Sequence, residues 1–165
     1  MGDHPKIDVP ASKWEKLFNL LSVILLVSSI IYVVQAYASL PETIPTHFNA
    51  KGEANGWGNK AIIFLMPGIA TFVCFLPMYF LSKAPHIFNY TVKVTEENAP
   101  RLYPKARLFM TVVNFETVAI FTYIAWEMVQ SARAVPTLGV WFTLVVVAVP
   151  LITIIVFMIQ MNRLK

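Results

Sequence analysis

The stretch LFNLLSVILLVSSIIYVVQAYAS occupies residues 17–39 and contains no acidic or basic side chain. An α-helix rises about 1.5 Å per residue, so a run of this length crosses the roughly 30 Å of a bilayer's hydrocarbon core. The run is also too long for the apolar core of a typical signal peptide. Just before it, Ser12 and Glu15 have the spacing of a capping box, so we expect the helix to begin there.

Three further apolar runs have the length of membrane spans: Ile62–Leu81, Leu108–Val129 and Val140–Gln160. Hydrophobic residues make up 57% of the chain and charged residues 13%, about half the charged share of a soluble domain. This composition argues against a soluble enzyme and against a disordered chain. We therefore predict an all-α integral membrane protein, with four transmembrane helices in one bundle and a single domain over residues 1–165.

The basic residues predict how the bundle is oriented, because Lys and Arg concentrate in cytoplasmic loops. Ten of them lie in the two tails or between spans two and three: Lys6, Lys13, Lys16, Lys83, Lys93, Arg101, Lys105, Arg107, Arg163 and Lys165. The other three are Lys51, Lys60 and Arg133. We expect both termini in the cytoplasm and the 40–61 loop outside. The net charge of +4 then reflects topology, and no nucleic-acid partner is predicted.

The predicted outer loop reads LPETIPTHFNAKGEANGWGNK over residues 40–60. Its glycines suit tight turns, and Asn59 suits the start of the second span. Residues 44–48 alternate between apolar and polar side chains but include Pro45, so they could form at most an edge strand. The pattern predicts a structured loop of about twenty residues rather than a flexible tether.

Five side chains of this loop are candidates for a ligand site: His47, Asn49, Glu53, Trp57 and Lys60. They could bind an extracellular peptide or lipid, and Lys60 at a helix start could bind an anion. The alternative is that they only stabilise the turns by hydrogen bonds. One His with two carboxylates lacks the spacing of a metal site. We predict no metal, no cofactor and no catalytic residue.

The string Leu-Pro-x-x-Ile-Pro-x-His-Phe-Asn-x-x-Gly-x-x-x-Gly-Trp-Gly-x-Lys, followed by a helix with the early proline Pro67, resembles domain of unknown function 1648. That domain occurs in the membrane immunity protein of the sporulation-delaying-protein toxin system and in small stand-alone relatives. The resemblance covers residues 40–67 most closely. It implies a multi-pass protein of a bacterial or archaeal plasma membrane, with an immunity or signalling role.

The third span carries three polar residues, Asn114, Glu116 and Glu127. Glu116 lies near the middle of the span, where an ionisable side chain is expensive and faces the bundle. Glu127 follows eleven residues later, on nearly the same helix face. The three could line a proton or substrate pathway. Alternatively, Glu116 could clamp the helices by a hydrogen bond to Ser28, Ser29, Thr71 or a backbone carbonyl. Water or Arg133 could solvate Glu127 near the outer surface.

Two functional hypotheses follow from these residues. The first is a non-enzymatic binding or immunity-type module that uses the outer loop. The second is a small proton-coupled transporter that uses Glu116. In both cases the lipid bilayer is the main environment, and the chain could act as an oligomer. An intramembrane enzyme is disfavoured because no nucleophile and base are paired in the sequence.

Overall fold

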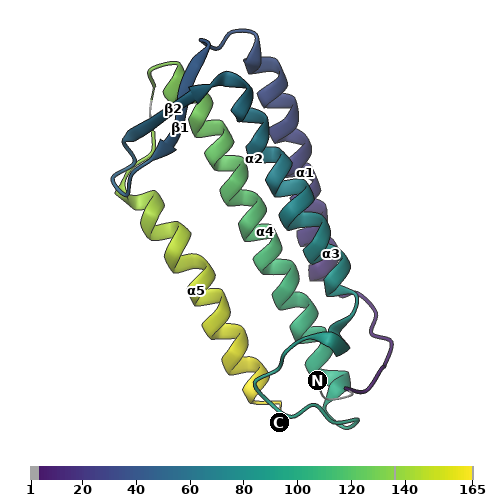
Figure 1. Cartoon of the computed structure of the whole chain (residues 1–165). Helices are drawn as coiled ribbons and strands as arrows, with labels where there is room; N and C mark the ends of the chain where they lie inside the picture. The colour runs from purple at the N-terminus through teal and green to yellow at the C-terminus, as the bar shows by residue number, and fades with distance from the viewer. Residues whose placement is uncertain (1–3, 136, 165) are drawn as a thin grey trace.

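The structure is a computed structural model that describes residues 4–135 and 137–164. Four long helical segments run side by side, with a β-hairpin at one end and both chain termini at the other (Figure 1). We call these the hairpin end and the terminal end. The elements in chain order are α1 (Lys13–Tyr37), β1 (Thr43–Phe48), β2 (Ala54–Asn59), η1 (Lys60–Phe64), α2 (Leu65–Gly68), η2 (Ile69–Phe75), α3 (Leu76–Ser82), η3 (Pro85–Ile87), α4 (Ala99–Ala132) and α5 (Val140–Asn162).

The prediction of four spans is confirmed within the described residues. The helical segments Lys13–Tyr37, Lys60–Ser82, Ala99–Ala132 and Val140–Asn162 are each long and apolar enough to cross a membrane. This indicates a multi-pass membrane protein in a lipid bilayer. The all-α class needs one correction, because β1 and β2 form a small antiparallel sheet. Residues 44–48, which could form at most an edge strand, are part of β1, and the partner strand comes from the same loop.

The first helix begins where its capping residues predict. The Ser12 hydroxyl accepts a hydrogen bond from the Glu15 backbone N–H at 3.1 Å, and the Glu15 carboxylate accepts one from the Ser12 N–H at 3.2 Å. These contacts satisfy two N–H groups that a helix start leaves free. The predicted capping box is thus confirmed.

The second span is not a uniform α-helix. It opens with a 3₁₀ segment, η1, and passes through short α2 into η2, a π-helix, before α3 completes it. The wide turns of η2 lie between Pro67 and Pro77, two residues that lack a backbone N–H donor. The Thr71 hydroxyl donates to the Pro67 carbonyl at 2.8 Å. π-helical segments of this kind recur at functional or strained positions in helices.

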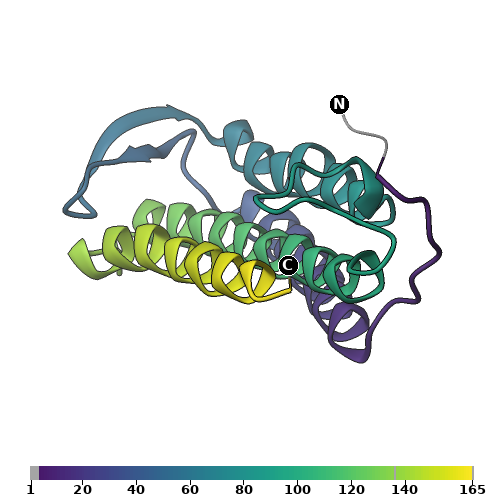
Figure 2. The ribbon, with the colours of Figure 1, turned by 90° about the horizontal axis from the view of Figure 1, so that it is seen from below.

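Helix α4 is the centre of the bundle. It has 34 residues, so it is about 51 Å long and extends well beyond a bilayer's hydrocarbon core. Helix α1, the second span and α5 surround it (Figures 1 and 2). Helix α5 makes its main helix contact with α4 and contributes no buried residue. Side chains on different faces of α4 therefore contact different helical segments.

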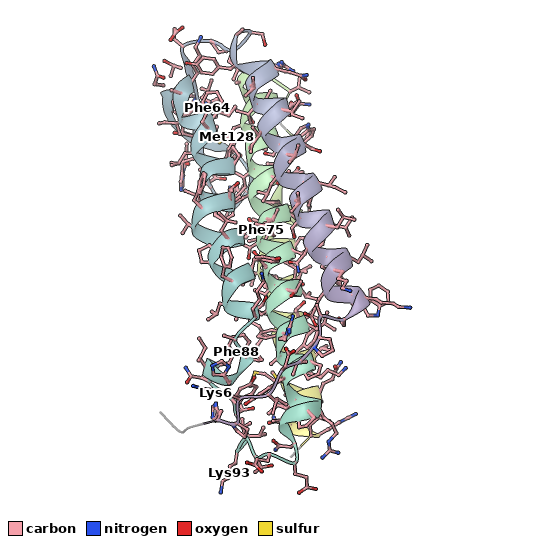
Figure 3. All side chains as sticks on the ribbon, turned by 90° about the vertical axis from the view of Figure 1, so that its right-hand side faces the viewer. Lys6, Phe64, Phe75, Phe88, Lys93 and Met128 are labelled. Atoms are coloured by element: carbon pink, nitrogen blue, oxygen red, sulfur yellow. The ribbon has the colours of Figure 1, made fainter. Side chains whose placement is uncertain are left out.

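Buried side chains form three clusters along α4. Figure 3 shows Met128 of one cluster near the hairpin end and Phe75 of another at mid-height. The third cluster contains Leu102 and Tyr103 of α4. The mid-height cluster combines Leu26, Ala70, Phe75 and Val118 from three helical segments. Burial of apolar area stabilises such contacts by about 25 cal/mol per Å² outside lipid. Inside a bilayer, close packing takes over that role.

At the terminal end, hydrogen bonds hold the N-terminal tail against α4. The Tyr103 hydroxyl donates to the Pro5 carbonyl at 2.7 Å, and the Arg107 guanidinium donates to the Val9 carbonyl. The same guanidinium forms an ion pair with Glu15 at 3.0 Å, and Glu15 is only 2% exposed. The start of α1 is thus joined to α4 by a buried charge pair.

Candidate functional site at the hairpin and along α4

The hairpin is held in shape by Asn49. Its side-chain oxygen accepts hydrogen bonds from the N–H groups of Lys51 at 2.9 Å and Glu53 at 3.0 Å. Its amide nitrogen donates to the Glu53 carboxylate at 2.8 Å. Gly52 completes the turn with φ +83°, a conformation that a glycine adopts without steric strain. Asn49 and Glu53 therefore both take part in forming the turn.

The turn also rests on the loop between α4 and α5. A β-carbon placed on Gly52 would lie 2.5 Å from the carbonyl carbon of Leu138. Next to this contact, the Thr143 hydroxyl of α5 donates to the Ala50 carbonyl at 3.0 Å. The hairpin thus folds over the ends of the last two helices.

His47 lies in a groove between the hairpin and these helix ends. The groove has a volume of about 300 Å³ and is lined by Thr46, His47, Phe48, Asn49, Ala50, Ile124, Leu138, Phe142 and Thr143. Its walls are mostly apolar, with a few polar groups at the hairpin side, which is the usual make-up of a binding site. The sequence pattern identified His47 and Asn49, but not the walls from α4 and α5.

The His47 ring is fixed by a residue that the sequence analysis missed. Its Nδ1 lies 2.5 Å from the Oδ1 of Asn55 on the opposite strand. When Nδ1 donates to this oxygen, the neutral ring keeps Nε2 as a hydrogen-bond acceptor. Gly56 lies against His47 as well, because a β-carbon there would be 2.9 Å from the His47 Cβ. The only sequence signal for this pairing is the spacing of His47 and Asn55 across the turn.

Trp57 and Lys60 lie outside the groove lining. Trp57 pairs with Pro45 across the hairpin and is 61% exposed, which leaves its ring available to a lipid or partner. Lys60 forms an ion pair with Glu42 at 2.9 Å and lies over the Tyr37 ring, 5.0 Å from its centroid. The five residues proposed from the sequence therefore do not converge on one point.

The polar residues of α4 are likewise separated. Asn114 is buried and donates to the Phe75 carbonyl at the end of η2, at 3.1 Å. Glu116 faces α5, where the Thr153 hydroxyl donates to its Oε1. The partner is therefore Thr153, and the candidates Ser28, Ser29 and Thr71 were wrong. Helical spacing explains why Asn114 and Glu116 have different partners. Side chains two positions apart on a helix point to nearly opposite faces.

Two acceptor atoms of this region have no hydrogen-bond partner among the described residues. They are the buried Oε2 of Glu116 and the buried Oδ1 of Asn114. A buried polar atom left unpaired is destabilising, so each one requires a physical explanation. Glu116 thus has one bonded and one unbonded oxygen between α4 and α5.

Glu127 is fully buried and anchors the loop that follows α4. It accepts hydrogen bonds from the Ser131 hydroxyl at 2.8 Å, the Thr137 hydroxyl at 2.6 Å and the Thr137 N–H at 3.1 Å. Arg133, one of the two partners considered for it, instead donates to the Ser39 hydroxyl at 3.2 Å. Polar donors rather than a cation therefore satisfy Glu127.

Among residues 4–135 and 137–164, no three His, Cys, Asp or Glu side chains are placed together to hold a metal ion. The free thiol of Cys74 lies in η2.

The hairpin lies in the part of the chain that matches a protein-family model. A family model described as "Domain of unknown function (DUF1648)" matches residues 24–71, from the middle of α1 through the hairpin into η2. An uncharacterised protein of Archaeoglobus fulgidus is 37% identical over 51 residues, which cover 31% of this chain and 26% of that protein. No solved structure matches the chain. The family match therefore centres on the hairpin and the two helical segments on either side of it.

Proposed function

We propose that the chain is a non-enzymatic binding module of the plasma membrane, of the immunity or signalling type. The groove beneath the hairpin would bind an extracellular peptide or lipid. The observation that carries this proposal is the joint position of His47, Asn49 and the apolar residues of α4 and α5 around one groove of about 300 Å³. The family match to the hairpin region supports it.

The proposal includes a topology and a domain organisation. We take both termini to be cytoplasmic, because ten of the thirteen basic residues lie in the tails or in the loop between the second and third spans. The hairpin and its groove would then face the outside, at the level of the lipid headgroups. We also take the chain to act as one membrane domain.

The experiment uses the sporulation-delaying toxin as probe, because the toxin system of the resembled immunity protein supplies it. Toxin-sensitive bacterial cells are transformed with the chain and challenged with the purified toxin, and survival is counted. Expression should protect the cells, and His47→Ala should lower protection at least tenfold. Lys51→Ala is the matched control, because Lys51 is exposed on the hairpin but does not line the groove.

Two outcomes would speak against this function. Cells that express the chain and die like empty-vector cells would exclude immunity to this toxin. Full protection by His47→Ala would show that the groove is not the binding site. Membrane fractions are probed for the tagged variants, so that a loss of protein is not read as a loss of binding.

A second candidate, a small proton-coupled transporter, rests on the unpaired Oε2 of Glu116. A buried carboxyl with one free oxygen is a group that could take up and release a proton within the membrane. The chain is reconstituted in liposomes with an entrapped pH dye, and an imposed potential drives proton flux. Glu116→Gln should abolish the flux, and Thr117→Val serves as control. No flux above empty liposomes, or equal flux in Glu116→Gln, would exclude it.

A further inference from the structure

A second groove lies toward the terminal end, between α3, α4 and α5. It has a volume of about 320 Å³, and its lining includes Leu81, Ile87, Phe88, Phe109 and Met161. Figure 3 shows Phe88 toward the terminal end of the bundle. Leu81 is 40% exposed and Ile87 is 54% exposed, so the groove opens to the outside of the bundle. It shares no lining residue with the groove beneath the hairpin.

The level of this groove in the bundle follows from two contacts of α4. Lys105 donates to the side-chain oxygen of Gln160, in the last turn of α5, at 3.0 Å. Arg107 pairs with Glu15, in the first turn of α1, at 3.0 Å. The end of α5 and the start of α1 therefore lie at one level of α4, and the end of α3 joins them through the groove lining. Because the apolar spans end there, this is the level of lipid headgroups.

Each of the three helices that line the groove carries a basic residue within two positions of a lining residue. These are Lys83 after α3, Lys105 in α4 and Arg163 after α5. Among the described residues, none of the three forms an ion pair with a carboxylate. Glu96 and Glu97 precede α4, whereas Lys105 lies about 9 Å into that helix. The three helices thus bring uncompensated positive charge to the level of the groove.

The amines of Lys105 and Lys83 keep donors for a further acceptor. The Nζ of a lysine carries three N–H groups, and Gln160 accepts from only one of those on Lys105. The Nζ of Lys83 lies over the Tyr79 ring, 4.2 Å from its centroid, a contact with the ring face that involves no oxygen acceptor. Phosphate oxygens at the headgroup level are suitable acceptors, because a hydrogen bond between two charged groups is stronger than a neutral one.

We propose that this groove binds one anionic phospholipid of the adjacent leaflet. An acyl chain lies along the apolar lining, and the phosphate is bound by the amines of Lys83 and Lys105. Charge complementarity identifies the occupant, because basic pockets between membrane helices are typical sites for anionic lipid headgroups. The bound lipid also fills space beside α5, a helix that contributes no buried residue to the bundle. The proposal does not depend on the ligand of the hairpin groove.

A lipid titration tests the selectivity for negative charge. The purified chain in detergent micelles is titrated with dioleoyl phosphatidylglycerol or dioleoyl phosphatidylcholine, and native mass spectrometry counts the bound lipids. The two lipids have the same acyl chains and differ in net charge. The first phosphatidylglycerol should bind with a Kd at least tenfold lower than that of the first phosphatidylcholine. Equal Kd values for the two lipids would overturn the proposal.

Two double variants separate this groove from the basic surface as a whole. Lys83→Gln with Lys105→Gln should raise the Kd for phosphatidylglycerol by roughly fivefold per lysine and leave that for phosphatidylcholine unchanged. Lys13→Gln with Lys16→Gln is the matched control. It removes the same charge from the first turn of α1, which does not line the groove, and should leave both Kd values unchanged. Equal effects of the two double variants would indicate general attraction to anionic lipid and would overturn the proposal.

A competition experiment distinguishes a lipid from a free phosphate compound. sn-Glycerol 3-phosphate carries a phosphate without acyl chains, and an excess of it should leave phosphatidylglycerol bound. Displacement by this compound would show that the apolar lining takes no part in binding and would overturn the proposal. Thermal unfolding of each variant accompanies the titrations. Lys83 is exposed, so the single variant Lys83→Gln tests the site even if the double variant is unstable, and an unchanged Kd in that variant would contradict the phosphate contact.

Discussion

Gly52 is the residue at which the hairpin touches the end of the bundle. Its positive φ and the 2.5 Å approach to Leu138 leave no room for a side chain. A methyl group there would have to displace backbone, which is far less adaptable than the end of a flexible side chain. The contact thus depends on a single residue type at a single position.

We predict that Gly52→Ala destabilises the protein by at least about 1 kcal/mol, because a left-handed conformation alone has that effect on a residue with a β-carbon. Thermal unfolding in detergent measures the change. Gly68→Ala is the control, because no atom lies within 4 Å of a β-carbon placed there. Equal thermal unfolding midpoints for Gly52→Ala and Gly68→Ala would contradict the close contact between Gly52 and Leu138.

The ion pair of Glu15 and Arg107 provides a second prediction for single residues. Arg107→Ala should destabilise the folded protein by about 3–5 kcal/mol, because it leaves the Glu15 carboxylate buried without its partner. Glu42→Ala removes one partner of the exposed pair with Lys60, where the Glu42 side chain is 79% exposed, and should change stability by less than about 1 kcal/mol. Chemical unfolding in mixed micelles compares the two, and similar losses would refute a buried pair.

At the scale of elements, the loop from α4 to α5 is organised by Glu127. Both Ser131 and Thr137 donate to this carboxylate, so the end of α4 and the stretch before α5 share one acceptor. We predict that Glu127→Ala speeds hydrogen exchange of residues 137–139 at least tenfold. Ser131→Ala removes only one donor and should have a smaller effect. Unchanged exchange in Glu127→Ala would mean that other contacts hold the loop.

The spans were predictable from the sequence because lipid imposes length and apolarity on each segment independently. The capping of α1 by Ser12 was equally local and equally predictable. The hairpin was less predictable from the sequence, because Pro45 argues against a strand. In the folded chain, Pro45 is nevertheless part of a strand and pairs with Trp57. The π-helical η2 lies between Pro67 and Pro77, and no single residue of the span indicates it.

The candidate site was predictable only in its local part. His47 and Asn49 lie in the motif itself, whereas Phe142 and Thr143 join the groove from nearly a hundred residues away. The partner of Glu116 shows the same limit. Helical spacing could not tell that a residue of α5, rather than one of α1 or the second span, donates to Glu116.

At the scale of the whole molecule, the bundle has an even number of spans, so both termini share one end (Figure 1). The concentration of Lys and Arg predicts that this end is cytoplasmic. In a Cys74→Ala background, a membrane-impermeant maleimide added to intact cells should label Lys51→Cys and not Lys93→Cys. Both of these lysines are exposed. The reverse labelling pattern would invert the topology and place the hairpin groove inside the cell.

The contact between the hairpin and the ends of the last two helices has a consequence for biosynthesis. The hairpin leaves the ribosome long before α5, yet one wall of its groove is built from Leu138, Phe142 and Thr143. During synthesis the first three helical segments can therefore enter the membrane while the groove does not yet exist. Binding competence would appear only when α5 has been inserted, so the chain would acquire its site at the last step of its own assembly.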